Sequence, residues 1–183
     1  MPLSLSDIEH IFARRGGEQY TGEPVTHLEH ALQAATLAEA EGASDELVTA
    51  ALLHDLGHLL HDMEETPSAR GIDDVHQYRV VPFLRGVFPD AVIDAIQRHV
   101  DAKRYLCAAR PGYHEALSED SQRSLRLQGG IFDSRQADAF IAEPGAPDAV
   151  RVRLWDDLAK QPGMATPDLA HFLARARNCM QAR

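Results

Sequence analysis

One apolar run limits what this chain can fold into. Residues 51–60 read ALLHDLGHLL, with His54 and Asp55 at the centre and His58 one helical turn later. The run is typical of a buried helix, and burying an ionised Asp55 costs several kcal/mol unless another group pairs with it. Imidazole and carboxylate groups are common metal ligands. The segment therefore predicts a buried metal site, provided that the rest of the chain supplies more ligands.

Helical periodicity covers nearly all of the 183 residues, and we find no alternating strand, internal repeat or low-complexity stretch. The sequence predicts one all-α domain, 1–183, built as a compact helical bundle. We expect the metal-site core at about 20–160 and a C-terminal helix at 166–181. The other expected helices begin near 6, 26, 44, 73, 89, 118 and 146.

Several residues mark the expected ends of these helices. Ser6 with Glu9, and Thr26 with Glu29, have the spacing of capping boxes. The helix from Ser44 is expected to run through the histidine–aspartate pair to about residue 63. Residues 62–73 are polar and contain proline and glycine, so we interpret them as a loop over the mouth of a site.

Composition excludes several classes of partner. The net charge is −10, and no cluster of basic residues could follow a phosphate backbone, so we expect no nucleic-acid partner. No apolar run approaches the roughly 18 residues of a membrane span. The two cysteines, Cys107 and Cys179, lie far apart and suit a reducing cytoplasm. We expect a cytoplasmic protein that is a monomer or a weak homodimer.

Four histidines recur at a nearly constant interval. The steps from 30 to 54, 54 to 76 and 76 to 99 are 24, 22 and 23 residues. Each step equals about one helix plus one turn, so successive antiparallel helices could each present one ligand at a common level. With two aspartates, they form the expected metal ligands: His30, His54, Asp55, His76, His99 and Asp156.

The remaining histidines receive simpler interpretations. His58 lies on the face of His54, where we expect a substrate contact rather than a further metal ligand. The others are expected at the surface or at helix caps: His10, His27, His61, His114 and His171.

The ligand order resembles that of the HD-domain superfamily, whose dinuclear members have all six positions. A carboxylate has two oxygens and can bridge two cations about 3.5–4 Å apart, a role that suits Asp55. More specific segments resemble the HD-domain mixed-valent diiron oxygenases that cleave carbon–phosphorus bonds. They are YTGE at 20–23, LEHALQAA at 28–35, AALLHDLGH at 50–58, HVDAKRYL at 99–106, LSEDSQRSLRLQGG at 117–130 and RLWDDLAK at 153–160.

This resemblance implies two iron ions, Fe(II) and Fe(III), with O₂ as co-substrate. One ion would be held by His30, His54, Asp55 and Asp156, and the other by Asp55, His76 and His99. The implied reaction converts a 1-hydroxy-2-(amino or trimethylammonio)ethylphosphonate to phosphate and glycine or glycine betaine.

The resemblance also implies a pocket for the phosphonate, formed by His58, Lys103, Ser121, Ser124, Gln128 and Arg153. The residue types suit an oxyanion, because Arg offers a planar fork, Lys a point charge, and hydroxyl and amide groups neutral donors. Tyr20 is implied as a lid and Glu23 as the partner of the substrate's cationic group. Tyr20, His58 and Lys103 are the expected catalytic residues.

Some features depart from the pattern of these oxygenases, and other functions use the same ligands. Thr21 follows the lid tyrosine where an apolar residue is expected, the loop 62–75 does not match, and Gln77 replaces an expected acid. A dinuclear HD phosphohydrolase acting on a small phosphate ester is the main alternative. A non-catalytic metal-binding protein is a third.

Overall fold

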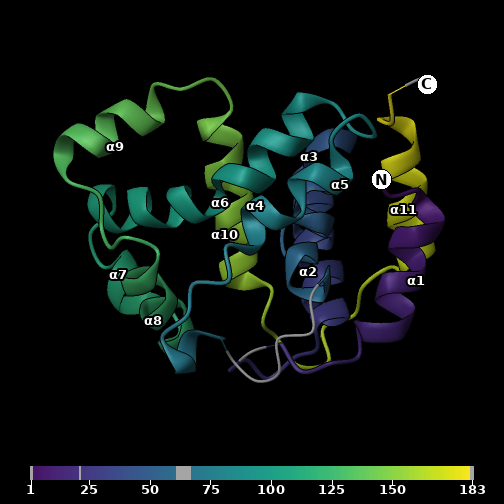
Figure 1. Ribbon diagram of the computed structural model, residues 1–183, viewed down its shortest axis with the longest axis horizontal. Coiled ribbons are helices and arrows are strands. Elements are labelled where there is room, and N and C mark those ends of the chain that lie inside the picture. Colours follow the sequence, from purple (N-terminus) through teal and green to yellow (C-terminus); the bar gives the residue numbers. More distant parts are fainter. Residues whose placement is uncertain (1, 21, 61–66, 182–183) are drawn as a thin grey trace.

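The fold is a bundle of helices, given by a computed structural model that describes residues 2–20, 22–60 and 67–181 (Figure 1). Within these residues, extended backbone pairs only in two isolated bridges. The α-helices are α1 Leu5–Arg15, α2 His27–Ala40, α3 Asp45–Leu53, α4 His76–Arg79, α5 Val81–Leu84, α6 Asp90–Ala109, α7 Tyr113–Ala116, α8 Glu119–Leu127, α9 Ser134–Ile141, α10 Ala146–Leu158 and α11 Leu169–Asn178. Two 3₁₀ helices, η1 Leu56–Leu60 and η2 Pro67–Arg70, complete the set.

Helices α2, α3, α6 and α10 form the centre of the bundle. Every residue from Leu47 to Leu53 of α3 is buried, as the continuous apolar run predicts. Alanines of α2 at 31, 34, 35 and 38 are also buried, and their small side chains let neighbouring helices approach closely. Trp155 of α10 is 1% exposed, and burying one large apolar side chain contributes about 1.5–3 kcal/mol.

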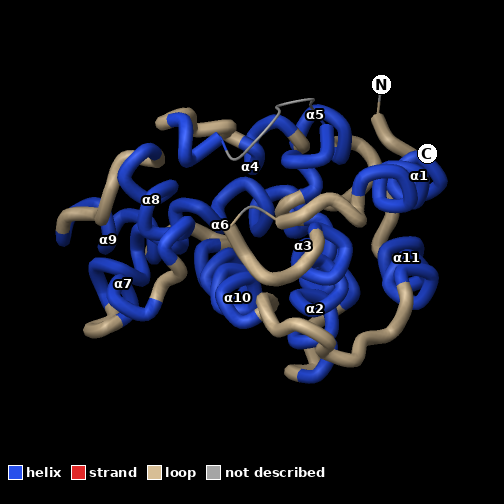
Figure 2. Tube along the Cα trace, turned by 90° about the horizontal axis from the view of Figure 1, so that it is seen from below, coloured by secondary structure: helices blue, strands red, loops and turns tan. Residues whose placement is uncertain are grey.

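Smaller helices cover the two ends of this centre. Helices α1 and α11 lie together on the right in Figure 1, whereas α7, α8 and α9 lie on the left against α6. Figure 2 shows the same division from below. Near the two chain ends, Leu3 N–H donates to the Phe83 carbonyl and Gln181 N–H to the Val87 carbonyl. Among the described residues, no helix combines the length and apolarity that a bilayer crossing requires.

Several helix boundaries differ from the sequence expectation. Helix α1 begins after Ser4, which forms a capping box with Asp7, not after Ser6. Leu3 and Ile8 both pack into the core, and such a contact across the first turn favours Ser4 as the cap. The C-terminal helix is Leu169–Asn178, shorter than the expected 166–181, because Asp168 caps its first turn.

Two expected long helices are interrupted. The helix from Ser44 ends at Leu53 and continues as the tighter η1, so His54 lies at its end rather than in its interior. The segment 73–87 forms the two one-turn helices α4 and α5, because Pro82 cannot donate to a continuous helix. Helices α7 and α9 were not expected, although Asp133 and Gln136 form a capping box for α9.

Candidate metal centre and substrate pocket

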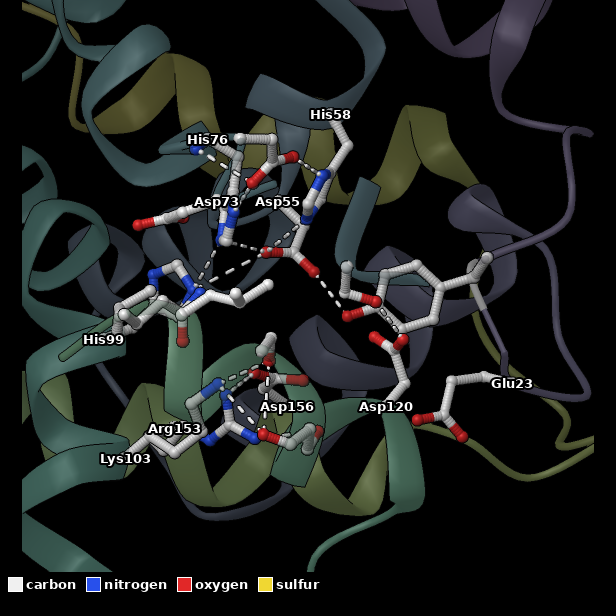
Figure 3. A pocket seen from close by; sticks show the side chains of 18 of the residues that line it. Glu23, Asp55, His58, Asp73, His76, His99, Lys103, Asp120, Arg153 and Asp156 are labelled. Carbon is white, nitrogen blue, oxygen red and sulfur yellow. Dashed lines mark hydrogen bonds and ion pairs between the residues drawn. The ribbon is translucent and has the colours of Figure 1, made fainter. Parts of the chain in front are cut away.

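The six expected metal ligands meet where the central helices pack together. Figure 3 labels the four of them that line the pocket: Asp55, His76, His99 and Asp156. All six are buried, and they come from α2, the end of α3, α4, α6 and α10. They form two groups whose ligand atoms lie within 4.8 Å of one another, and Asp55 belongs to both. The first group is His30, His54, Asp55 and Asp156, and the second is Asp55, His76 and His99.

In the first group, two imidazoles face each other without a shared hydrogen. The Nε2 atoms of His30 and His54 are 3.1 Å apart, and their Nδ1 atoms lie 2.8 Å from the carbonyl oxygens of Ala159 and Ala51. A carbonyl oxygen can only accept, so each Nδ1 carries the proton and each Nε2 of a neutral ring presents a lone pair. Two lone pairs directed at each other are the arrangement that a cation stabilises.

Two carboxylate oxygens complete this first group. Asp55 Oδ2 lies 3.5 Å from His30 Nε2 and 3.4 Å from His54 Nε2. Asp156 Oδ1 lies 3.4 Å from His30 Nε2 and finds no hydrogen-bond donor among the described residues. A buried carboxylate oxygen without a donor is costly, so this oxygen also fits the ligand of a metal ion.

The second group repeats the arrangement around the other oxygen of Asp55. His76 Nε2 and His99 Nε2 are 3.2 Å apart, and Asp55 Oδ1 lies 3.2 Å from the former and 3.5 Å from the latter. His99 Nδ1 donates to the Ile96 carbonyl at 2.7 Å. Each oxygen of Asp55 therefore faces one histidine pair, an arrangement that fits the donor set of a dinuclear centre.

Protonation of the histidines competes with metal binding. Burial lowers the pKa of His76, but Asp55 and Asp74 raise it to about 10, while burial and neighbouring histidines hold the pKa of His99 well below its ordinary value. The pKa of His54 is raised by Asp55 against the same effect of burial. A cation would displace these protons, so metal affinity should decrease as the pH falls.

Asp74 is a site residue that the sequence analysis missed. Its Oδ1 accepts from His76 Nδ1 at 2.9 Å, and its Oδ2 lies 2.5 Å from His58 Nδ1. His58 and His76 stack with ring centroids 4.0 Å apart. Asp74 therefore orients a metal ligand and the neighbouring expected substrate contact together. The order Asp-Val-His at 74–76 was the available signal, because a carboxylate often holds the second nitrogen of a ligating histidine.

Gly57 brings the two groups together. A side-chain Cβ at this position would lie 2.1 Å from the backbone oxygen of His76, a distance that no real contact allows. The absence of a side chain therefore lets η1 cross directly beside α4. This crossing places His76 next to the pair His54 and Asp55.

Tyr20 covers the first group. Its hydroxyl donates to Asp55 Oδ2 at 2.7 Å, and its ring stacks on His30 at a centroid distance of 4.1 Å. Burial and the charge of Asp55 raise the pKa of the Tyr20 phenol. His27, expected at the surface or at a cap, is the first residue of α2 and packs edge-on against Tyr20. Burial and nearby His58 lower the pKa of His27 to about 4.

A pocket opens beside the metal ligands and contains all of the expected substrate residues, with Lys103 and Arg153 in its wall. Lys103 Nζ donates to Ser124 Oγ at 2.9 Å, and burial, together with the charge of Arg153, lowers the Lys103 pKa to about 7. Ser121 and Gln128 also line the pocket, and their helical spacing predicts one face of α8 for both.

Arg153 is more strongly held than the sequence suggested. Its Nη1 lies 2.8 Å from Asp156 Oδ2, its Nη2 pairs with Asp157, and its Nε donates to the Tyr113 hydroxyl at 3.3 Å. Although burial raises it, Arg153 keeps the pKa of Asp156 below its ordinary range. The guanidinium thus connects Asp156 to the pocket, as the i, i+3 spacing of the two residues on α10 allows.

Glu23 also has an unexpected partner. Lys160 Nζ lies 2.9 Å from Glu23 Oε1, and both side chains line the pocket. Figure 3 shows Glu23 and Asp120 on one side and Lys103 and Arg153 on the other, so the pocket has an acidic and a basic side. Lys160 was missed because its sequence position follows the end of α10, where a surface residue is the usual interpretation.

The other expected positions have ordinary surroundings or are not described. His10 and His171 are exposed, His171 lies beside Glu39, and His114 is half-buried. Gln77 is buried beside the ligand His76. His61, Thr21 and positions 62–66 of the expected loop lie outside the described residues, and 67–70 form η2.

Known proteins share this chain's domain. Residues 26–159 match the HD domain family. A 1-hydroxy-2-(trimethylamino)ethylphosphonate dioxygenase (glycine-betaine-forming) of Leisingera caerulea is 43% identical over 162 residues, 88% of this chain and 83% of the relative. A hydroxymethylphosphonate dioxygenase of Gimesia maris is 41% identical over 166 residues, 90% of this chain and 83% of the relative. This chain therefore belongs to the HD domain family, in the same branch as these two phosphonate dioxygenases.

Proposed function

We propose that the protein is a diiron oxygenase that cleaves the carbon–phosphorus bond of a small 1-hydroxyphosphonate. The observation that carries this proposal is the pair of facing histidine couples on the two oxygens of Asp55, in a chain 43% and 41% identical to two phosphonate dioxygenases. The substrate we favour is a 1-hydroxy-2-(amino or trimethylammonio)ethylphosphonate, with O₂ as co-substrate. The products would be phosphate and glycine or glycine betaine.

The metal assignment follows the two ligand groups. His30, His54, Asp55 and Asp156 would hold one iron, and Asp55, His76 and His99 the other. Imidazole and carboxylate ligands without a thiolate suit Fe, Mn or Zn, and the Fe(II)/Fe(III) pair is our choice because the relatives are named dioxygenases. The iron pair would supply the redox chemistry with O₂ that no side chain of this chain can provide.

The chain's own residues would bind and orient the substrate. Lys103, Ser124 and Gln128 offer donors to the phosphonate from one wall, with Ser121, Arg153 and His58 beside the ligands. Tyr20 would leave Asp55 when substrate enters and would otherwise exclude water from the first group. Glu23 would receive the cationic end of the substrate, opposite the basic side.

The ligands alone would equally serve a phosphohydrolase, so the test must separate oxidation from hydrolysis. Phosphate release is measured from 1-hydroxyphosphonates and from phosphoethanolamine, with and without O₂, while iron per chain is counted. We expect phosphate only from the hydroxyphosphonates, only with O₂, and two irons per chain. Phosphate appearing from a phosphonate under strict anaerobiosis, or from the ester alone, would reject the oxygenase.

We further propose that the protein works in the cytoplasm as a monomer or a weak homodimer. Its two cysteines are unpaired thiols in the structure, in keeping with a reducing compartment. Sedimentation of the purified protein at two concentrations tests the oligomeric state.

A further inference from the structure

The ion pair between Glu23 and Lys160 lies in the wall of the substrate pocket. Glu23 is 9% exposed, and the Lys160 side chain is 12% exposed, so neither charge is well solvated. Each charge therefore depends on the other, and removing one leaves the other buried without a partner. Asp120, the other labelled acid on this side, already accepts from Arg123 and Ser68.

Lys160 also lies beside two hydroxyl groups at the start of α8. Its Nζ lies 3.3 Å from Ser121 Oγ and 3.5 Å from Ser118 Oγ. Ser121 Oγ is in turn 3.4 Å from Arg153 Nη2. The ammonium of Lys160 is therefore within hydrogen-bond reach of the Glu23 carboxylate and of the Ser121 hydroxyl. Arg153 also contacts this hydroxyl.

We propose that Lys160 is a specificity-determining residue that changes partners when substrate binds. This inference rests on the function proposed above. The substrate's cationic group takes the place of Lys160 at Glu23, and the freed ammonium turns toward the substrate's phosphonate. Only side-chain rotation is required, because Ser118 and Ser121 already lie beside Nζ. The pocket then selects zwitterionic phosphonates.

The pairing of buried charges explains this selectivity. A zwitterion replaces the Glu23–Lys160 pair by two new pairs, and no buried charge loses its partner. An anion with an uncharged tail faces a choice, since it must either do without Lys160 or leave Glu23 unpaired in the pocket wall. Such an anion therefore binds more weakly for a reason located in the chain, not in the metal centre.

The exchange is tested by calorimetric binding of two matched probes to the metal-loaded protein under anaerobic conditions. The probes are 2-aminoethylphosphonate and propylphosphonate, which differ in an ammonium against a methyl group. Neither has a 1-hydroxyl group or an ester bond, so neither is consumed by an oxygenase or a phosphohydrolase of this kind. We expect the unmodified protein to prefer the aminoethyl probe by about tenfold or more, as for a hydrogen-bonded charge.

The variants Glu23→Gln, Lys160→Met and their combination isolate the exchange. Glu23→Gln frees Lys160, so propylphosphonate should bind this variant about tenfold more tightly than it binds the unmodified protein. The preference for 2-aminoethylphosphonate over propylphosphonate should then disappear. Adding Lys160→Met should abolish that gain, whereas Lys160→Arg in its place should retain it. Thermal unfolding verifies that each variant is folded, and Lys160→Gln replaces Lys160→Met if the latter is not.

Two results would overturn the exchange. In one, Glu23→Gln leaves propylphosphonate binding unchanged or weaker. In the other, Lys160→Met changes the affinity for propylphosphonate by the same factor in the unmodified protein and in Glu23→Gln. Because the probes are not turned over, these results are independent of whether hydroxyphosphonates release phosphate, so failure of the exchange and failure of the proposed function are distinguishable.

Discussion

The metal-ligand cluster and the pocket wall touch each other but are built differently. Three of the four histidines that we propose as metal ligands are held at Nδ1 by backbone carbonyls, those of Ala159, Ala51 and Ile96. In the wall, charged side chains hold one another, as in Glu23–Lys160 and Arg153–Asp157. The cluster therefore has one arrangement fixed by the main chain, whereas the wall contains partners that substrate can replace.

This difference teaches where function can vary. A ligand anchored on a carbonyl moves only if its helix moves, and helices α2, α6 and α10 are packed in the core. A side chain held by another side chain can exchange partners through a rotamer change at small cost. We therefore expect relatives with the same ligands to differ in substrate through the wall.

Replacing Asp55 by Ala should have the largest effect, because its two oxygens serve both histidine pairs. We expect iron to fall from two ions per chain toward none and activity to be lost. Metal analysis by mass spectrometry after gel filtration measures this. Retention of two ions in Asp55→Ala would show that the cluster does not depend on a shared carboxylate.

Replacing Lys103 by Met tests the wall without disturbing the cluster. The change removes a charged donor, worth roughly 1.5–3 kcal/mol, so KM should rise by about 10- to 100-fold while two irons stay bound. Steady-state kinetics with iron counting measures both. We expect Arg153→Met, in contrast, also to weaken metal binding, because its guanidinium lies 2.8 Å from Asp156.

Replacing Asp74 by Asn tests a carboxylate that connects the two regions. Loss of its charge should weaken the orientation of His76 and lower affinity for the second metal ion by about 10- to 100-fold. Metal titration gives the affinities, and Asp73→Asn is the matched control at the adjacent, half-buried position. Equal effects of the two changes would mean that the contact with His76 does not matter.

The wall should also produce a pH dependence. Burial and the charge of Arg153 lower the pKa of Lys103 to about 7, so the ammonium that attracts an anion is lost above this pH. We expect kcat/KM to fall by up to about tenfold per pH unit above 7, and this fall should be absent from Lys103→Met. A profile that is unchanged in the variant would assign the dependence to another group.

The smallest effect is expected at a helix cap. Thr26→Ala removes the capping box of α2, which carries His30, and should cost about 1 kcal/mol in the free energy of unfolding. Ser4→Ala removes the equivalent box of α1, which carries no ligand. In urea denaturation, we expect both variants to lose a similar amount of unfolding free energy. Only for Thr26→Ala should the size of this loss change when iron is added.

The sequence predicted the metal-ligand cluster better than the pocket wall, because the main chain holds the cluster and side-chain pairs hold the wall. Ligand spacing reflects helix length and connection, so the order of His30, His54, His76 and His99 indicated that they meet. The all-α fold, the cap Thr26 and the helix starts near 44 and 118 were confirmed as well.

Features that depend on tertiary contacts were not predictable from local pattern. Helix α3 ends at Leu53 because His54 and the following turn meet α4, although the apolar run continues. Lys160 acquires its role from Glu23, a partner 137 residues away, which no periodicity reveals.

Gly57 has a consequence for the nuclearity of the centre. Because a Cβ there would meet the His76 carbonyl at 2.1 Å, a single added methyl group must push α4 away from η1. We expect such a chain to keep the first group, His30, His54, Asp55 and Asp156, but to lose the position of His76 in the second group. The number of metal ions that we propose for this protein should thus depend on a backbone crossing as much as on the donor atoms.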